Sequence, residues 1–289
     1  MRTRVFRAAA VAGLVSASAL AATPAAAPAG PWTKVPALPT ACYSNQDQWW
    51  DQNNAAIDTV NQAHYAQNDI NEAIRQKFND AQAANPMAMA QALQQKMMAD
   101  PQNAQKYMEQ IMQQGQQLQT EVPAQGQRAQ QFEAESKTVM KQYETSLAHA
   151  MGPADARWTA LKKKMGIAMD SPGPGEAGVP DWAWVEWGVI LRERDQAYAA
   201  NCAQWWSATG PIHGYMKRYK DYLVQERIPY EKKITEEPAL EQYRTLGIPT
   251  TGWRTTTDFQ AAADYMKMAS TMFGERKGRP YCGADGRCE

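Results

Sequence analysis

Six methionines fall within 26 residues in the first half of the chain: Met87, Met89, Met97, Met98, Met108 and Met112. Thioethers are soft ligands that suit Cu(I), so the Met-x-Met and Met-x-x-x-Met spacings predict one possible chemistry, copper binding. The same side chains at helical spacing, such as the Met89, Leu93 and Met97 stripe, could instead pack in a core. A third interpretation is an adaptable apolar groove for another polypeptide, because Met side chains fit varied partners. The residue types leave all three interpretations open.

The methionines should lie on two helices, because two dipeptides precede them with the pattern of a helix start. Asn85-Pro86 and Asp100-Pro101 each place a capping side chain before a proline at the first helical position. Both helices have a Gln-rich opposite face. The residues that we expect to form an apolar binding surface are Met97, Tyr107, Met108, Ile111 and Met112.

Residues 85–122, with their methionines and their Asn-Pro and Asp-Pro dipeptides, resemble the Met-rich helical domains of Hop-type and ubiquilin-type chaperone adaptors. The grooves of those domains hold apolar segments of client proteins. The resemblance therefore implies a groove with that role for this segment.

Two longer helices should carry the Met-rich segment at the tip of an elongated hairpin. Apolar residues recur at helical spacing over 45–84 and over 127–150. We expect Val122-Pro123 and Gly126 to interrupt the helical pattern, and Gly152-Pro153 to end it before a short helix over 154–168. The hairpin would span residues 42–170.

A Gly/Pro-rich stretch, residues 171–180, is the clearest linker and predicts a boundary before a Trp-rich helical half, residues 181–289. In this half the pattern predicts a helix from Ile212 that breaks at Pro229, and a last helix that starts with a Thr257-x-x-Gln260 capping box. Good helix formers dominate and no alternating strand pattern appears, so the fold class is all-α.

Two Trp-Trp pairs, Trp49-Trp50 and Trp205-Trp206, follow Cys42 and Cys202 by a few residues. Stacking on sugars is one interpretation of so many indoles. We favour a structural one, in which the pairs form a core layer beside a disulfide, because Trp buries a large apolar area.

The first 21 residues have the pattern of a secretory signal peptide. Arg2, Arg4 and Arg7 precede the apolar run 8–20, and Ala19-Leu20-Ala21 offers a cleavage site. An Ala/Pro-rich lead over 22–41 should then be extended and mobile. The pattern predicts an exported protein, periplasmic or secreted, that is not integral to the membrane.

An exported chain with four cysteines is expected to form two disulfides. The loop between Cys282 and Cys288 is short and contains two glycines, which favours pairing of these two. This leaves Cys42 to pair with Cys202.

Composition and motifs exclude several function classes. Loss of the signal arginines leaves a net charge of about −3, which does not suit nucleic-acid binding. The three histidines are isolated, so we expect no zinc site and no cofactor. Gly173-x-Gly175-x-x-Gly178 has prolines around it and is interpreted as linker, and Lys162-Lys163-Lys164 as a solvated helix face.

The sequence therefore favours a non-enzymatic exported protein of the cell envelope that binds or scaffolds, for example by holding apolar segments of partner proteins. A Cu(I)-binding protein is the alternative. A hydrolase without a recognisable motif is the third, because no nucleophile motif or metal motif occurs. The sequence leaves the ligand and the oligomeric state open.

Overall fold

The computed structural model describes residues 30–40, 46–99, 101–165 and 180–273, without the side chains of residues 46, 47, 93, 96 and 101–120. Over these ranges the chain is helical and contains no strand, which confirms the all-α class. The main helices are α1 (Gln46–Ala84), α2 (Ala88–Ala99), α3 (Pro101–Met165), α4 (Asp181–Trp206), α5 (Pro211–Tyr222), α7 (Glu237–Thr245) and α8 (Thr257–Met272).

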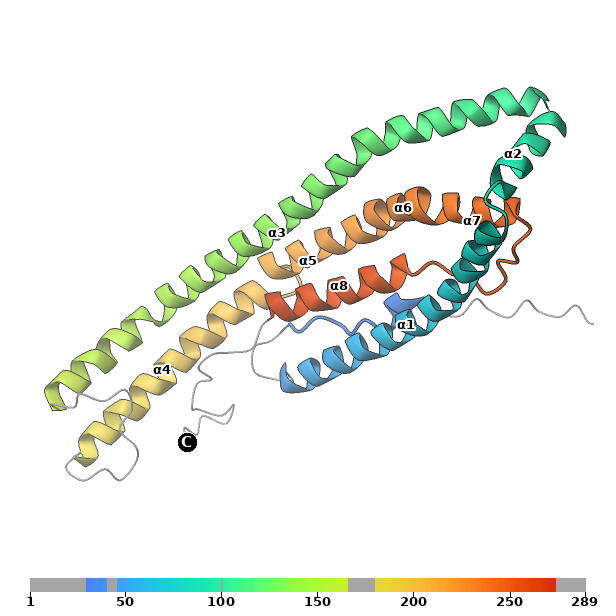
Figure 1. Ribbon diagram of the computed structural model, residues 1–289. Coiled ribbons are helices and arrows are strands. Elements are labelled where there is room, and N and C mark those ends of the chain that lie inside the picture. Colours follow the sequence, from blue (N-terminus) through green and yellow to red (C-terminus); the bar gives the residue numbers. More distant parts are fainter. Residues whose placement is uncertain (1–29, 41–45, 100, 166–179, 274–289) are drawn as a thin grey trace, which may run out of the picture.

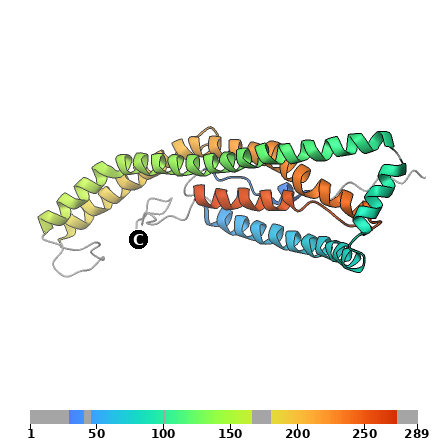
Figure 2. The ribbon, with the colours of Figure 1, turned by 45° about the horizontal axis from the view of Figure 1, so that its top comes forward.

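The helices form an elongated body with α1 along one side and α3 along the other (Figures 1 and 2). α8 packs on α1, α4 pairs with α3, and α5 contacts both α3 and α8. Helices of the C-terminal half thus lie between the two arms that we expected to form a hairpin. α1 and α3 each bury their apolar stripe against those helices instead of against each other.

One hydrophobic core joins both halves of the chain. From the first half it contains Trp49, Val60 and Phe132, and from the second half the fully buried Tyr215 and Phe273. A second, smaller cluster lies between α3 and α4, and a third between α1 and the region of α7. The Gly/Pro-rich stretch before α4 therefore does not separate two independent cores.

α3 runs without interruption through both of its prolines, so the expected break near Pro123 and the expected stop at Gly152-Pro153 are wrong. A proline removes one helical hydrogen bond. Both Pro123 and Pro153 are exposed, so water can satisfy the carbonyl group that is left unpaired. Packing of the turns between them, through buried Phe132 and Tyr143, offsets the remaining cost.

Residues 211–245 also stay helical, so the expected break at Pro229 is wrong. Two π-helical segments, η2 (Leu223–Arg227) and η3 (Lys232–Glu236), flank the short α6 (Ile228–Glu231). Each π segment ends two residues before a proline, Pro229 or Pro238. The wider π turn gives the proline ring room where a regular α-turn would clash with it.

Residues 30–40 lie against the core, although we expected them within an extended, mobile lead. They begin with a short 3-10 helix, η1 (Pro31–Lys34), and contact α8. The Trp32 ring lies 5.8 Å from the Tyr265 ring, and the Pro39 carbonyl oxygen lies 3.0 Å from Nε2 of His213. Proline blocks helix formation here but does not prevent the apolar side chains from packing.

Buried amide side chains fix the position of α1 on α8 and on the loop before it. Asn53 Nδ2 donates to the Met266 carbonyl (3.2 Å) and to Ser270 Oγ (2.8 Å). Gln67 Nε2 donates to the Gly252 carbonyl (3.0 Å), and Asn71 Nδ2 to the Arg254 carbonyl (2.9 Å). Because buried amides must be hydrogen-bonded, these contacts set the register of the two helices.

Candidate functional site

The Met-rich segment lies at one end of the elongated body, where α2 joins α1 to the start of α3 (Figure 1). Met87, just before α2, is 61% exposed, and Met98, near its end, is 66% exposed. Met89 and Met97 are half-buried. The structure thus divides these methionines between a packed face, which agrees with the core interpretation, and an outward face, which does not.

The thioethers of α2 cannot all reach one metal ion. Met87 and Met98 are separated along the helix by ~16 Å at 1.5 Å per residue, and Met89 and Met97 by ~12 Å. Metal–sulfur bonds are only about 2.3 Å long. A copper site would therefore need thioethers of α3, and the side chains of Met108 and Met112 lie outside the described part of the structure.

Of the expected apolar binding surface, the structure describes the side chain of Met97 only. Tyr107, Met108, Ile111 and Met112 belong to the helical backbone of α3, whose first part contacts α2. The backbone therefore brings the two Met-rich helices together, as the hypothesis requires. Whether these four side chains form one surface with Met97 stays a prediction.

The two Trp-Trp pairs are mainly core residues, as the structural interpretation expects, whereas the disulfide beside them stays a prediction. Trp49, Trp205 and Trp206 are buried, and Trp206 packs edge-on against Phe273 with ring centroids 5.2 Å apart. Buried indoles offer no ring face for a sugar to stack on. The fully buried Cys202 lies beside Tyr143, Sγ to Oη 3.5 Å.

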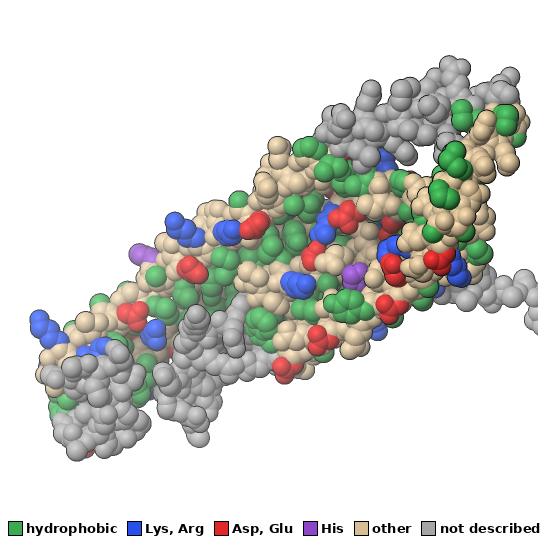
Figure 3. Space-filling view, viewed as in Figure 1, with side chains coloured by type: hydrophobic (Ala, Val, Ile, Leu, Met, Phe, Trp, Pro, Cys, Tyr) green, Lys and Arg blue, Asp and Glu red, His purple; other side chains and the backbone are tan. Residues whose placement is uncertain are grey.

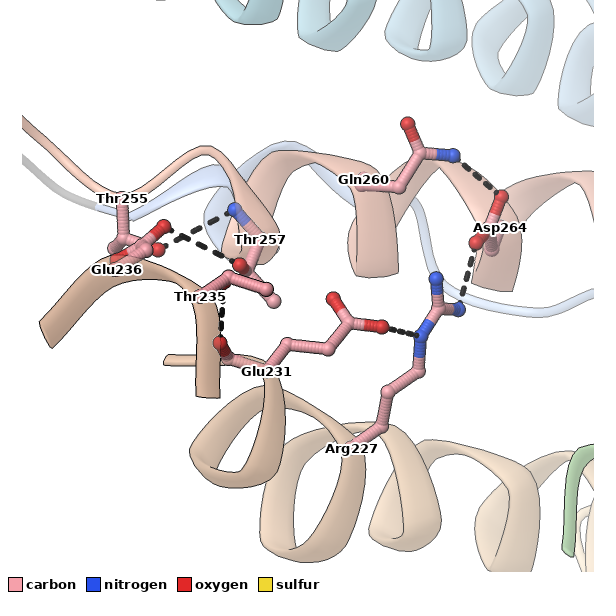
Figure 4. Close-up of polar contacts among 8 residues, drawn as sticks. All are labelled: Arg227, Glu231, Thr235, Glu236, Thr255, Thr257, Gln260 and Asp264. Carbon is pink, nitrogen blue, oxygen red and sulfur yellow. Dashed lines mark hydrogen bonds and ion pairs between the residues drawn. The ribbon is translucent and has the colours of Figure 1, made fainter. Parts of the chain in front are cut away.

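A polar cluster that the sequence did not indicate joins the π segments to α8 (Figure 4). Arg227 Nε donates to Glu231 Oε1, and Nη1 donates to Asp264 Oδ2, both at 2.7 Å. Burial by itself would lower the pKa of Arg227, but the hydrogen bonds and charges of Glu231 and Asp264 raise it on balance. Since the guanidinium and both carboxylates satisfy one another, this cluster holds helices together and presents no free reactive group.

The start of α8 differs from the expected capping box. Glu236, at the end of the second π segment, accepts hydrogen bonds from the Thr256 amide (3.2 Å) and from Thr257 Oγ1 (3.3 Å). Gln260 does not reach back to the cap, and its Nε2 donates to Asp264 Oδ1 instead (2.9 Å; Figure 4). A carboxylate from another helix therefore stabilises the positive end of the α8 dipole.

Metal sites in proteins use several His, Cys, Asp or Glu side chains that converge on one ion. The described residues hold no group of three such side chains that could bind a metal ion. His64 stacks on Tyr65 of α1, and His213 packs on Phe273 in the core. None of the described helices is both long and apolar enough to cross a membrane.

Comparisons with protein-family models, with curated proteins and with solved structures find no match to this chain. The resemblance of residues 85–122 to the chaperone-adaptor domains therefore stays a prediction. Any function must be inferred from the surfaces that the helices present.

Proposed function

We propose that this protein is an exported, non-enzymatic binding or scaffolding protein, and that its Met-rich end holds apolar segments of partner proteins. The observation that carries the proposal is the exposure of Met87 and Met98 on opposite ends of α2. Flexible thioether side chains adapt to apolar surfaces of different shape, and exposed apolar groups are typical of protein-binding sites.

The place of α2 in the fold supports the same proposal. The helix α2 packs mainly on α3, α7 and α1, and both of its flanking dipeptides contain proline. Val122, farther along α3, adds a third exposed apolar side chain, 49% exposed. A helix with so few supporting contacts can adjust its position to a bound segment at small cost.

Export and the disulfides are part of this proposal, because the signal-peptide pattern and three of the four cysteines lie outside the described residues. Cys202 carries no free thiol and is buried, which supports a disulfide at this position, and we propose Cys42 as its partner. Non-reducing peptide mapping of the exported protein should link Cys42 to Cys202 and Cys282 to Cys288. A peptide that links Cys42 to Cys282 or Cys288 would contradict this pairing.

A double variant, Met87→Gln with Met98→Gln, tests the binding function. The measured quantity is the suppression of aggregation of a chemically denatured test protein when this protein is added in excess. Because both side chains are exposed, the substitutions should change the free energy of unfolding by less than about 0.5 kcal/mol. Suppression should fall severalfold.

The matched control is Tyr65→Ser with Ile70→Ser, which removes two exposed apolar side chains from α1, 63% and 47% exposed. This control should suppress aggregation as well as the original protein does. If the methionine variant keeps full suppression, or if the control loses as much, the Met-rich end is not the binding surface.

A further inference from the structure

The end of the body opposite the Met-rich segment consists of two paired helices, the last turns of α3 and the first turns of α4 (Figures 1 and 2). A small core closes the pair, with buried Leu161 and Ile190 and half-buried Trp158 and Trp187. Ion pairs Arg157–Glu193 and Arg194–Asp155 join the same helices. This end is therefore a rigid, narrow projection.

The outward face of α4 at this projection is apolar. Trp182 is 44% exposed and Val185 is 69% exposed, and half-buried Val189 continues the stripe one turn later. The spacing of three and four residues places the three side chains on one side of the helix. The inward face carries Ala183 and Ile190 instead, which pack on α3. The stripe is therefore not required for the pairing of the two helices.

Three consecutive lysines lie at the end of α3, beside the start of α4, and one of them, Lys164, contacts the apolar stripe. Lys164 Nζ lies 4.2 Å from the centre of the Trp182 ring, and Lys162 Nζ lies 5.5 Å from that of Trp158. Lys163 is exposed between them. Figure 3 shows basic side chains at this end with acidic and hydrophobic ones among them.

The local charge of the projection is positive. Arg157 and Arg194 are neutralised by their ion pairs, which leaves the three lysines and the exposed Arg192. The opposing charges on the same turns of α4 are Asp181, Glu186 and Asp195, so the described residues of the projection keep only a small positive excess. The positive charge is concentrated at the end of α3, where the three lysines are consecutive.

We propose that this projection, defined by Lys162, Lys163, Lys164, Trp182 and Val185, docks on the surface of an anionic lipid bilayer. Tryptophan and lysine suit this position, since an indole lies well at the level of the lipid headgroups and an ammonium group pairs with lipid phosphates. Binding at a bilayer surface grows with the apolar area buried and with attraction to anionic lipids, and the projection offers an apolar stripe and basic side chains.

Co-sedimentation of the purified chain with vesicles tests the proposal. The vesicles contain phosphatidylcholine alone or phosphatidylcholine with about one third phosphatidylglycerol, an anionic lipid. The chain should bind the anionic vesicles and not the neutral ones. Added salt should weaken the binding, because it screens the lysine charges.

Two sets of substitutions should separate the charge from the apolar stripe. Replacing Lys162, Lys163 and Lys164 together by Gln should lower partitioning to anionic vesicles about 10- to 100-fold, since each basic group near the surface contributes roughly a factor of five. Trp182→Ser with Val185→Ser should lower it severalfold and should also abolish quenching of the protein's fluorescence by brominated lipid chains.

Matched controls replace three exposed lysines elsewhere, Lys77, Lys141 and Lys217, by Gln, and use the exposed apolar pair Tyr65→Ser with Ile70→Ser. Circular dichroism should show the same helical content in all variants. If the lysine controls lower partitioning as much as the projection variants, or if the chain ignores anionic vesicles, the proposal is overturned. It is also overturned if the projection variants change only self-association, because a second copy would then cover this face.

Discussion

Both ends of this molecule carry exposed apolar side chains, but the two ends differ in how the neighbouring side chains are packed. At the α3–α4 end, Trp158 and Trp187 pack over buried Leu161 and Ile190, and ion pairs close the flanks. At the α2 end, Met89 and Met97 are only half-buried, and a single 12-residue helix carries them.

At each end, the type of apolar side chain matches the packing of the helices that carry it. Rigid indoles lie on a pair of helices that fix their direction, whereas flexible thioethers lie on a helix with few contacts. A surface that must fit different polypeptides benefits from adaptable side chains. A surface that meets a flat bilayer needs no adaptation, so it can be rigid.

The first prediction concerns the core that both ends share, and it has the largest expected effect. Burial raises the pKa of Tyr219 and of Tyr265 to about 12, against about 10 in an unfolded chain. The unfolded state therefore loses these protons first. The stability that the buried neutral phenols contribute is complete below pH ~10 and is lost as the pH rises toward ~12.

Urea unfolding followed by circular dichroism at pH 8 and at pH 11.5 measures this loss. Each tyrosine should contribute about 2 kcal/mol to the decrease. Tyr219→Phe with Tyr265→Phe should reduce the dependence on pH. If the double variant loses as much stability at high pH as the original chain, the two phenols are not responsible.

The second prediction compares the ends directly. Ile190 is 1% exposed, so Ile190→Ala should lower the free energy of unfolding by about 2–4 kcal/mol through lost burial and a cavity. Met97→Ala at the other end removes a half-buried side chain and should cost less than about 1 kcal/mol. Equal losses from the two variants would show that the Met-rich end is as well packed as the α3–α4 end.

Local signals in the sequence predict the starts of the helices well. α3 begins at Pro101, as Asp100-Pro101 predicts, and α2 begins at Ala88, two residues after Pro86, because a capping side chain and a preset proline angle act within one turn. The same reasoning fails at Pro123, Pro153 and Pro229. At these prolines, a cost of about 3 kcal/mol in helix stability is offset by the packing of many helical turns on either side. A local sequence pattern does not reveal that packing.

The arrangement of the helices could not be predicted, for a related reason. Buried Asn53 joins α1 to α8, and buried Gln67 and Asn71 join it to the loop before α8, although a sequence pattern assigns these residue types to solvent. Similarly, Lys164 is 18 residues from Trp182 in the chain, and the pairing of α3 with α4 brings them together. The sequence predicts the Met-rich segment because its methionines cluster. Only the structure shows which of the described methionines face inward and which face outward.

Because α3 is uninterrupted, this helix sets the distance between the two ends of the molecule. Its 65 residues extend about 100 Å along the axis at 1.5 Å per residue. If one end rests on a membrane, the helix determines how far from the lipid the other end can meet its partner. It also fixes the relative orientation of the two ends, because one residue added to α3 would rotate them by about 100° about the axis. The length of α3 therefore sets both the distance between the two ends and their relative orientation.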